Sequence, residues 1–92
     1  VLCSNGYPDT YKKNIEIKDL DSIKLKNDDY LFHAGTSLKD KKVFATGGRV
    51  LNFVSLSNEL IDAKKSIYNN LDILNWSEGF YRKDIGFKVI DK

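Results

Sequence analysis

The sequence RVLNFVSLSNELIDAKKSIYNNLDIL, residues 49–74, holds the two strongest secondary-structure signals in the chain. Its first part has the alternation of a β-strand, in which successive side chains point to opposite faces. One face then carries Val50, Asn52, Val54 and Leu56, and the other carries Leu51, Phe53 and Ser55. Because apolar residues occur on both faces, the alternation predicts a strand that is covered on both sides.

The second part of this stretch predicts an amphipathic helix over residues 57–74. Ser57 or Asn58 can cap it, and Glu59 suits the positive end of the helix dipole. One side bears an apolar stripe at steps of three and four, made of Leu60, Ala63, Ile67, Leu71 and Leu74 and widened by Ile61 and Tyr68. The residues expected to face outward are Lys64, Lys65, Asn69, Asn70 and Asp72. The helix should end near residues 74–75.

Short apolar segments before this stretch predict further strands. They lie at residues 1–4, around Ile15 and Ile17, around Ile23 and Leu25, at 30–34 and at 43–46. We expect the strand at 30–34 to be buried, and the charged residues 39–42 have the length of a hairpin connection. An irregular, aromatic-rich tail follows the helix. This order predicts an α+β fold, a single small domain over residues 1–92 with mainly antiparallel pairing.

Length and composition exclude several classes of protein. A chain of 92 residues with 12% aromatic residues suits one domain with a modest core, and is too apolar for a disordered tail. One Cys and one His cannot form an internal disulfide or a structural zinc site. No apolar run is long enough to span a membrane, and no signal-peptide pattern is present, so a reducing, cytoplasmic setting is expected. A net charge of +2 gives no electrostatic footprint for nucleic acid.

The distribution of basic residues singles out two positions. Of the 15 basic residues, 13 are Lys and only Arg49 and Arg82 are Arg. Arg differs from Lys in presenting a planar, forked set of donors, so we expect these two to be placed where that geometry matters. The chain has no Met and opens on the apolar Val1, which leads us to expect a fragment or a trimmed domain.

Gly47-Gly48-Arg49 is the first candidate binding element. Two glycines allow backbone N–H groups to approach a ligand, and the Arg49 guanidinium can bind phosphate or carboxylate in a forked manner. The alternative, which spacing alone favours, is a hairpin turn or strand bulge with Arg49 paired to a nearby acid.

The segment from Tyr81 to Gly86 is the second candidate. Arg82 and Lys83 could receive a phosphate, with Asp84 orienting Arg82. The alternative is an exposed Arg82–Asp84 pair that contributes about 0–1 kcal/mol. Spacing alone again favours the alternative.

Other chemically notable residues are more simply explained by structure. His33 is expected to be a hydrogen-bonded structural residue, Cys3 a small buried apolar one, and Trp76 part of the core. The chain has no phosphate-binding loop, dinucleotide fingerprint or nucleophile elbow. No residue is therefore predicted as a general base, nucleophile or metal ligand.

Four motifs together resemble one known family. They are Gly6-Tyr7-Pro8, the LFHAGT of residues 31–36, the GGRVL of residues 47–51 and the FYRKDIG of residues 80–86. In this order and at this spacing they resemble the C-terminal domain of phosphoribosylamine–glycine ligase over essentially the whole chain. The sequence departs from the family pattern at Asn14, where Gly is usual after Lys.

This resemblance implies a fold and a function. The family's ligase is an ATP-grasp enzyme that joins glycine to 5-phosphoribosylamine through a glycyl phosphate, with hydrolysis of ATP to ADP and phosphate, in purine biosynthesis. Its ATP and Mg²⁺ (or Mn²⁺) sites belong to the ATP-grasp portion, which is absent from these 92 residues, so this fragment alone is expected to bind no cofactor and to be inactive. The C-terminal domain resembles the small hybrid-motif domains of other ATP-grasp enzymes, packs on the remaining domains and helps to close the active-site cleft.

The resemblance also gives weight to particular residues. It implies Arg82, then Lys83, as ligands for the phosphate of 5-phosphoribosylamine or glycinamide ribonucleotide, and it makes Gly48 and Arg49 cleft-facing. The residues expected to be structural or supporting are His33, Thr36, Tyr81 and Asp84. The expected partners are the remaining domains of the same ligase and this substrate, not nucleic acid or a membrane. The alternative is a stand-alone binding module without catalytic activity.

Overall fold

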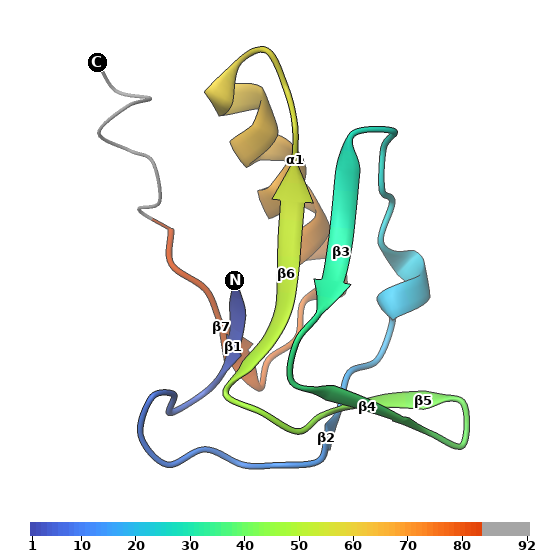
Figure 1. Ribbon diagram of the computed structural model, residues 1–92, viewed down its shortest axis with the longest axis vertical. Coiled ribbons are helices and arrows are strands. Elements are labelled where there is room, and N and C mark those ends of the chain that lie inside the picture. The colour runs from blue at the N-terminus through green and yellow to red at the C-terminus, as the bar shows by residue number, and fades with distance from the viewer. Residues whose placement is uncertain (84–92) are drawn as a thin grey trace.

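The computed structural model describes residues 1–83. Its elements are β1 (Leu2–Ser4), β2 (Ile15–Glu16), the 3-10 helix η1 (Leu20–Ser22), β3 (Asp29–His33), β4 (Thr36–Lys39), β5 (Lys42–Ala45), β6 (Arg49–Ser55), α1 (Leu60–Leu74) and β7 (Gly79–Phe80). The strands form a four-stranded antiparallel sheet of order β3-β6-β1-β7 and a three-stranded one of order β2-β5-β4. The expected α+β class with antiparallel pairing and one main helix is confirmed (Figure 1).

One long hairpin links the two sheets. β3 pairs with β6 in the larger sheet, and their continuations β4 and β5 pair in the smaller one. At the hairpin tip Asp40 and Lys41 both have positive φ, 53° and 65°, as a two-residue turn between twisted strands requires. The predicted connection at 39–42 is thus confirmed. Figure 1 shows that the hairpin bends sharply where one sheet gives way to the other.

The bend depends on Gly35. Its N–H donates to the Arg49 carbonyl at 2.8 Å, and its own carbonyl accepts from Thr46 N at 2.8 Å and from Gly47 N at 3.2 Å. A Cβ at Gly35 would lie 2.6 Å from the Arg49 carbonyl oxygen and 2.7 Å from Gly47 Cα. The backbone segments that contain Gly35 and Gly47 can therefore approach this closely only because neither residue has a side chain.

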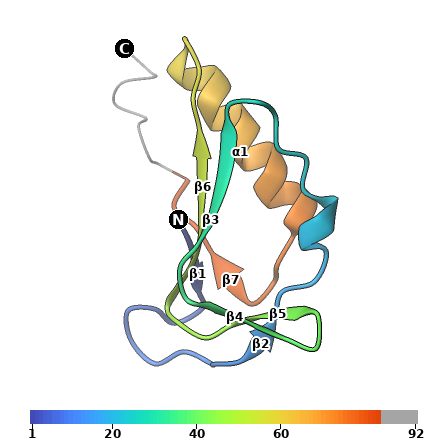
Figure 2. The same cartoon turned by 45° about the vertical axis from the view of Figure 1, so that its right-hand side comes forward.

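The core lies between α1 and one face of the larger sheet (Figure 2). Its central residues are Leu2, Ile17, Ala45, Val50, Leu51, Phe53, Leu71 and Leu74. Residues Leu51 and Phe53 of β6 are on the covered face, but Asn52 and Val54, on the other face, are only half-buried. The prediction that both faces of this strand are covered is therefore wrong for Asn52 and Val54. The α1 helix covers only the opposite face, which carries Leu51 and Phe53.

The helix is three residues shorter than predicted. It begins at Leu60, after Glu59 in an extended conformation, and no side chain caps it. Neither Ser57 nor Asn58 is the cap, because Glu59 occupies the cap position, and the Ser57 hydroxyl accepts a 3.4 Å hydrogen bond from Glu59 N instead. The end at Leu74 is as predicted, with Asn75 in the left-handed region.

The apolar stripe of α1 is covered except at its N-terminal end. Ala63, Leu71 and Leu74 are buried, whereas Leu60 is 46% exposed. Asn70 was expected to face outward but is buried, since its Oδ1 accepts a hydrogen bond from Lys24 N at 3.1 Å. The segment before β3 crosses that side of the helix, which periodicity within the helix could not indicate.

Other differences concern the outer strands. Residues around Ile23 and Leu25 are not a strand, since η1 and a turn precede β3. The strand near 30–34 is present but largely exposed, with Tyr30 at 44% and Phe32 at 54%. The tail after α1 contains an unpredicted short strand, β7, which pairs with β1. Across residues 1–83, no helix has both the length and the apolar character needed to cross a bilayer.

Candidate functional site

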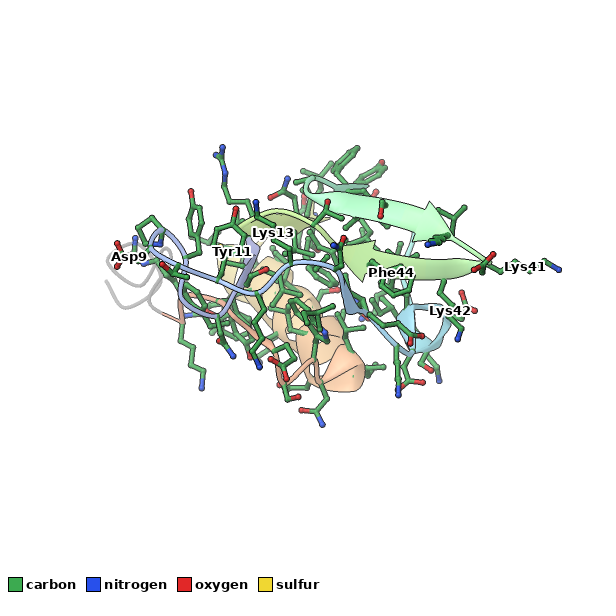
Figure 3. The ribbon with its side chains drawn as sticks, turned by 90° about the horizontal axis from the view of Figure 1, so that it is seen from below. Asp9, Tyr11, Lys13, Lys41, Lys42 and Phe44 are labelled. Carbon is green, nitrogen blue, oxygen red and sulfur yellow. The ribbon has the colours of Figure 1, made fainter. Side chains whose placement is uncertain are left out.

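A polar depression of about 600 Å³ lies at the bend between the sheets. Its lining comes from three parts of the chain, namely Val1, the Tyr7 and Tyr11 of the β1–β2 loop, and Ala34, Gly35, Gly48, Arg49 and Asn52 of the long hairpin. The smaller sheet adds no lysine to this lining. Figure 3 shows that Lys41 and Lys42 lie at the hairpin tip, at the opposite end from Tyr11 and Asp9.

Arg49 reaches this depression because of an irregularity in the β1–β6 pairing. Leu2 is opposite Leu51, but Cys3 is opposite Arg49, so Val50 is an extra residue in β6. Such a bulge breaks the two-residue period of the strand. Leu51 thus packs in the core while the exposed Arg49 lines the depression together with Asn52. A bulge was one of the alternatives that the sequence left open for this segment.

Gly48 lies beneath the ring of Tyr7. A Cβ at Gly48 would overlap that ring, so the missing side chain is what allows Tyr7 to line the depression. The neighbouring carbonyls are occupied by Ser4, whose N–H donates to the Gly48 carbonyl at 2.7 Å and whose hydroxyl donates to the Gly47 carbonyl at 2.9 Å. The glycine pair therefore fixes one wall of the site.

Arg82 borders a different hollow. An apolar groove of about 230 Å³ runs between α1 and the sheet, with a lining that includes Val1, Phe53, Lys64, Tyr68, Tyr81 and Arg82. The Tyr68 hydroxyl donates to the Arg82 carbonyl at 3.3 Å, and the Tyr68 and Tyr81 rings are 5.6 Å apart. Burial, with the negative charge of Asp72, raises the pKa of the Tyr81 hydroxyl, so Tyr81 remains protonated at neutral pH. Lys83 is exposed.

The structure does not bring all the predicted residues into one site. Gly48 and Arg49 share the polar depression, whereas Tyr81 and Arg82 line the apolar groove, and Val1 borders both. Asp84 lies outside the described residues. The exposed His33 has its Nδ1 2.9 Å from the Thr36 hydroxyl oxygen, beside the bend but not in the lining of the depression.

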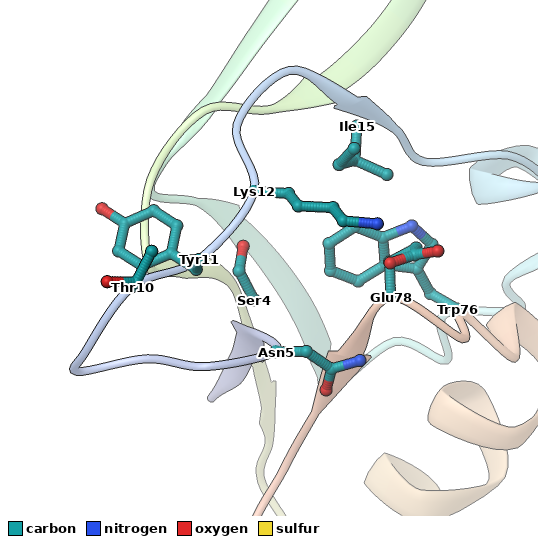
Figure 4. A pocket seen from close by; sticks show the side chains of 8 residues that line it. All are labelled: Ser4, Asn5, Thr10, Tyr11, Lys12, Ile15, Trp76 and Glu78. Carbon is teal, nitrogen blue, oxygen red and sulfur yellow. The ribbon is translucent and has the colours of Figure 1, made fainter.

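A third hollow, of about 430 Å³, is one that the sequence did not indicate. The residues around it are Ser4, Asn5, Thr10, Tyr11, Lys12, Ile15, Trp76 and Glu78. Figure 4 shows the Lys12 side chain extending across it toward Trp76 and Glu78. Trp76 packs against the core as predicted, and its Nε1 donates to the Glu16 carbonyl at 3.1 Å. No local pattern could reveal a wall made by residues more than 60 positions apart.

Two further features of residues 1–83 concern reactive groups, namely the thiol of Cys3 and the placement of possible metal ligands. Cys3 is buried, and burial raises the pKa of its thiol, although the N-terminal amino group and Arg49 oppose that shift. A thiol with a raised pKa is a poor nucleophile at neutral pH. Within residues 1–83, no group of three His, Cys, Asp or Glu side chains is placed to hold a metal ion.

Comparison with known proteins gives a consistent result. Residues 1–88 match the family model described as "Phosphoribosylglycinamide synthetase, C domain". The chain is 40% identical over 92 residues to a phosphoribosylamine–glycine ligase of Brucella melitensis, covering all of this chain and 22% of that protein. It is 41% identical over 90 residues to a trifunctional purine biosynthetic protein of Gallus gallus, covering 98% of this chain and 9% of the relative.

A solved structure agrees with these sequence matches. The crystal structure of a phosphoribosylamine–glycine ligase from Thermotoga maritima superimposes with a TM-score of 0.69 at 30% identity, over 91% of this chain and 20% of that one. The chain thus spans about a fifth of the length of the ligases it matches. With a family model covering residues 1–88 and a solved ligase sharing the fold, the chain belongs to the phosphoribosylglycinamide synthetase C-domain family.

Proposed function

We propose that this chain is the C-terminal domain of a cytoplasmic phosphoribosylamine–glycine ligase. That enzyme joins glycine to 5-phosphoribosylamine with hydrolysis of ATP to ADP and phosphate in purine biosynthesis. The observation that carries the proposal is the match of residues 1–88 to the C-domain family. It is accompanied by 40% identity, over all of this chain, to part of a phosphoribosylamine–glycine ligase. The ATP-grasp portion would belong to the four-fifths of the enzyme outside these residues.

ATP and Mg²⁺ (or Mn²⁺) are assigned to that other portion. In the part of the chain that the structure describes, no three His, Cys, Asp or Glu side chains are placed to hold a metal ion, and the metal would be held by the other portion of the enzyme. What the domain offers instead is a polar depression with an exposed guanidinium. Since the guanidinium carries its charge at every relevant pH, its task would be charge compensation and positioning rather than proton transfer.

The lining of the polar depression suits a phosphorylated sugar. The Arg49 guanidinium can bind a phosphate with two parallel hydrogen bonds, and the hydroxyls of Tyr7 and Tyr11 and the amide of Asn52 can bind ribose hydroxyls. Arg82 lines a mainly apolar groove, which is a poorer setting for a dianion. This contrast favours Arg49 as the ligand of the substrate phosphate, with Arg82 and Lys83 as the second choice.

The test compares two single substitutions in the full-length ligase. Arg49→Ala should raise the KM for 5-phosphoribosylamine about 10- to 100-fold, because a charge-assisted contact contributes roughly 1.5–3 kcal/mol, and should leave the KM for ATP unchanged. Arg82→Ala should raise the KM for the same substrate less. Arg49→Lys is the matched control, which keeps the charge but loses the forked geometry and should fall between the wild type and Arg49→Ala.

The result can contradict the proposal in a clear way. If Arg49→Ala changes neither KM, or changes the KM for ATP equally, Arg49 does not bind the phosphate. If only Arg82→Ala raises the KM for 5-phosphoribosylamine, the phosphate is bound by the segment after β7 instead. Circular dichroism of each variant shows whether a loss of affinity is a loss of folding.

A further inference from the structure

The four-stranded sheet has one face that the described residues leave uncovered. α1 packs on the face that carries Leu31, Leu51 and Phe53. On the opposite face, β3 presents Tyr30 and Phe32, and β6 presents their pairing partners Val54 and Asn52. We call these four residues the open face.

The open face is unusually apolar for a solvated surface. Tyr30 is 44% exposed and Phe32 54% exposed, and their rings stack 6.2 Å apart with an angle of 15° between the planes. An antiparallel sheet with one solvated face normally alternates apolar and polar residues along each strand. β3 instead places Leu31 toward the helix and two aromatic rings away from it, which is the pattern of a sheet covered on both sides.

The open face also adjoins the polar depression. Asn52 belongs to both, and Ala34, which follows directly after β3, lines the depression as well. A body that covered Tyr30 and Phe32 would therefore stand beside Arg49 and form a further wall of the depression. Such a wall would narrow the opening of the depression and make it more cleft-like.

We propose that the open face is the surface on which the remaining domains of the same ligase pack, with Phe32 as its central contact. This rests on the proposed function. The chain spans about a fifth of its relatives, so a large body of protein in the same polypeptide is available to cover the face. The ring stack gives that body a flat apolar surface, of the kind that Phe and Tyr form at the centres of interfaces.

The exposed apolar residues outside the open face are Val1, Leu25, Leu38, Leu56, Leu60, Ile61 and Phe80 among the described residues. Leu38, 74% exposed, is on β4 in the smaller sheet, and Leu56, Leu60 and Ile61 lie around the start of α1. Leu38 pairs across the hairpin with Val43 of β5. It therefore serves as a control that is more exposed than Phe32 but lies off the open face.

The test is site-specific photo-cross-linking in the full-length ligase. Phe32 is replaced by p-benzoylphenylalanine, which keeps the phenyl ring and adds a photoreactive benzoyl group, and in a second sample Leu38 is replaced by the same residue. After irradiation, position 32 should give an intramolecular cross-link to a peptide outside these 92 residues, and position 38 should give none. Peptide mass mapping identifies the partner segment.

Three results would overturn the proposal. They are no cross-link from position 32, a cross-link between two copies of the ligase, and equal intramolecular cross-linking from positions 32 and 38. The outcome is independent of the test of the proposed phosphate site. A cross-link from position 32 with an unchanged KM in Arg49→Ala would support the docking surface and refute the phosphate role, and the reverse combination would do the opposite.

Discussion

Asp29 joins three elements through one carboxylate. At the start of β3, its Oδ1 accepts a 2.6 Å hydrogen bond from the Ser55 hydroxyl of β6, and its Oδ2 accepts one of 2.7 Å from the Ser66 hydroxyl of α1. Oδ2 also accepts from the Lys26 backbone N–H at 3.1 Å. Burial by itself would raise the pKa of this carboxyl, but the three hydrogen bonds outweigh it and lower the pKa below its ordinary value of 3.8.

The lowered pKa predicts a pH-dependent contribution of Asp29 to stability. Because the folded-state pKa lies below the unfolded one, the stabilisation is fully present above pH 3.8 and is lost as pH falls through the folded-state pKa. Asp29→Asn should lower the free energy of unfolding at pH 7 by roughly 1–3 kcal/mol, and this difference from the wild type should shrink below pH 4. Urea unfolding between pH 3 and 7 measures it.

Asp28→Asn is the matched control for Asp29→Asn. Asp28 is the adjacent residue and is exposed. Its substitution should change the free energy of unfolding by no more than a few tenths of a kcal/mol. A similar loss in both variants, or a loss in Asp29→Asn that does not depend on pH, would show that the hydrogen-bonded carboxylate is not the cause.

At the scale of elements, the helix start can be improved. Glu59 occupies the cap position of α1 with the extended backbone that a cap needs, φ −117° and ψ 129°, but its side chain makes no capping hydrogen bond. Asp is shorter and reaches the N–H groups of the first turn, which Glu does not reach here.

Glu59→Asp should therefore raise the free energy of unfolding by about 0.5–1 kcal/mol. The charge is unchanged, so the gain would come from the hydrogen bond and not from the helix dipole. Glu59→Ala, which removes the negative charge at the positive end of the helix dipole but no capping hydrogen bond, should lower the free energy of unfolding by about 0.3–1 kcal/mol. Denaturant titrations of the wild type, Glu59→Asp and Glu59→Ala measure these differences in stability. Equal unfolding midpoints for the wild type and Glu59→Asp would refute this account of the helix start.

The bent hairpin is the other element whose shape rests on few atoms. Gly35→Ala would place a Cβ 2.6 Å from the Arg49 carbonyl oxygen and 2.7 Å from Gly47 Cα, and backbone cannot easily move aside. We expect a loss of about 3 kcal/mol or more in the free energy of unfolding. Gly47→Ala, whose Cβ would be 3.1 Å from Gly35 Cα, should cost less. Thermal unfolding shows which of the two variants is less stable. An equal loss of stability in Gly35→Ala and Gly47→Ala would contradict the idea that the two backbone segments are closest at Gly35.

At the scale of the whole molecule, the proposed function predicts that these residues do not work alone. The 92-residue chain, incubated with ATP, glycine and 5-phosphoribosylamine, should release no ADP above background, because the relatives that carry the reaction's name are about five times as long. Adding the full-length ligase to the same mixture is the positive control. Measurable turnover by the isolated chain would favour an independent enzyme over a domain of a larger one.

The helix and the hairpin tip could be predicted because their signals are local. The stripe from Leu60 to Leu74 repeats within a single element, and the turn at Asp40 and Lys41 needs only its own residues. The same local reasoning failed at Asn70 and Phe32. Asn70 is buried by the segment near Lys24, and Phe32 is exposed because no described element covers its side of the sheet.

The candidate site could be predicted only in part, for a similar reason. The motif at Gly47-Gly48-Arg49 indicated a segment that lines the polar depression, but the reach of Arg49 into the depression depends on the bulge opposite Cys3. Tyr7 belongs to a family motif, but neither Tyr7 nor Tyr11 was predicted to line the depression. Arg82, which the resemblance made the first choice for the phosphate, borders a separate groove.

The sequence by itself determined the fold class, the position of the helix end and the hairpin tip, and the resemblance that the family match confirmed. These rest on periodicity, turn chemistry and residue identity, which are properties of short segments. Only contacts in the folded protein decided that Gly35 and Gly47 lie against each other, which face of the sheet stays open and which residues share a depression. Those features arise from contacts between segments far apart in the chain. The way these segments pair depends on where backbone atoms can approach without a side chain between them.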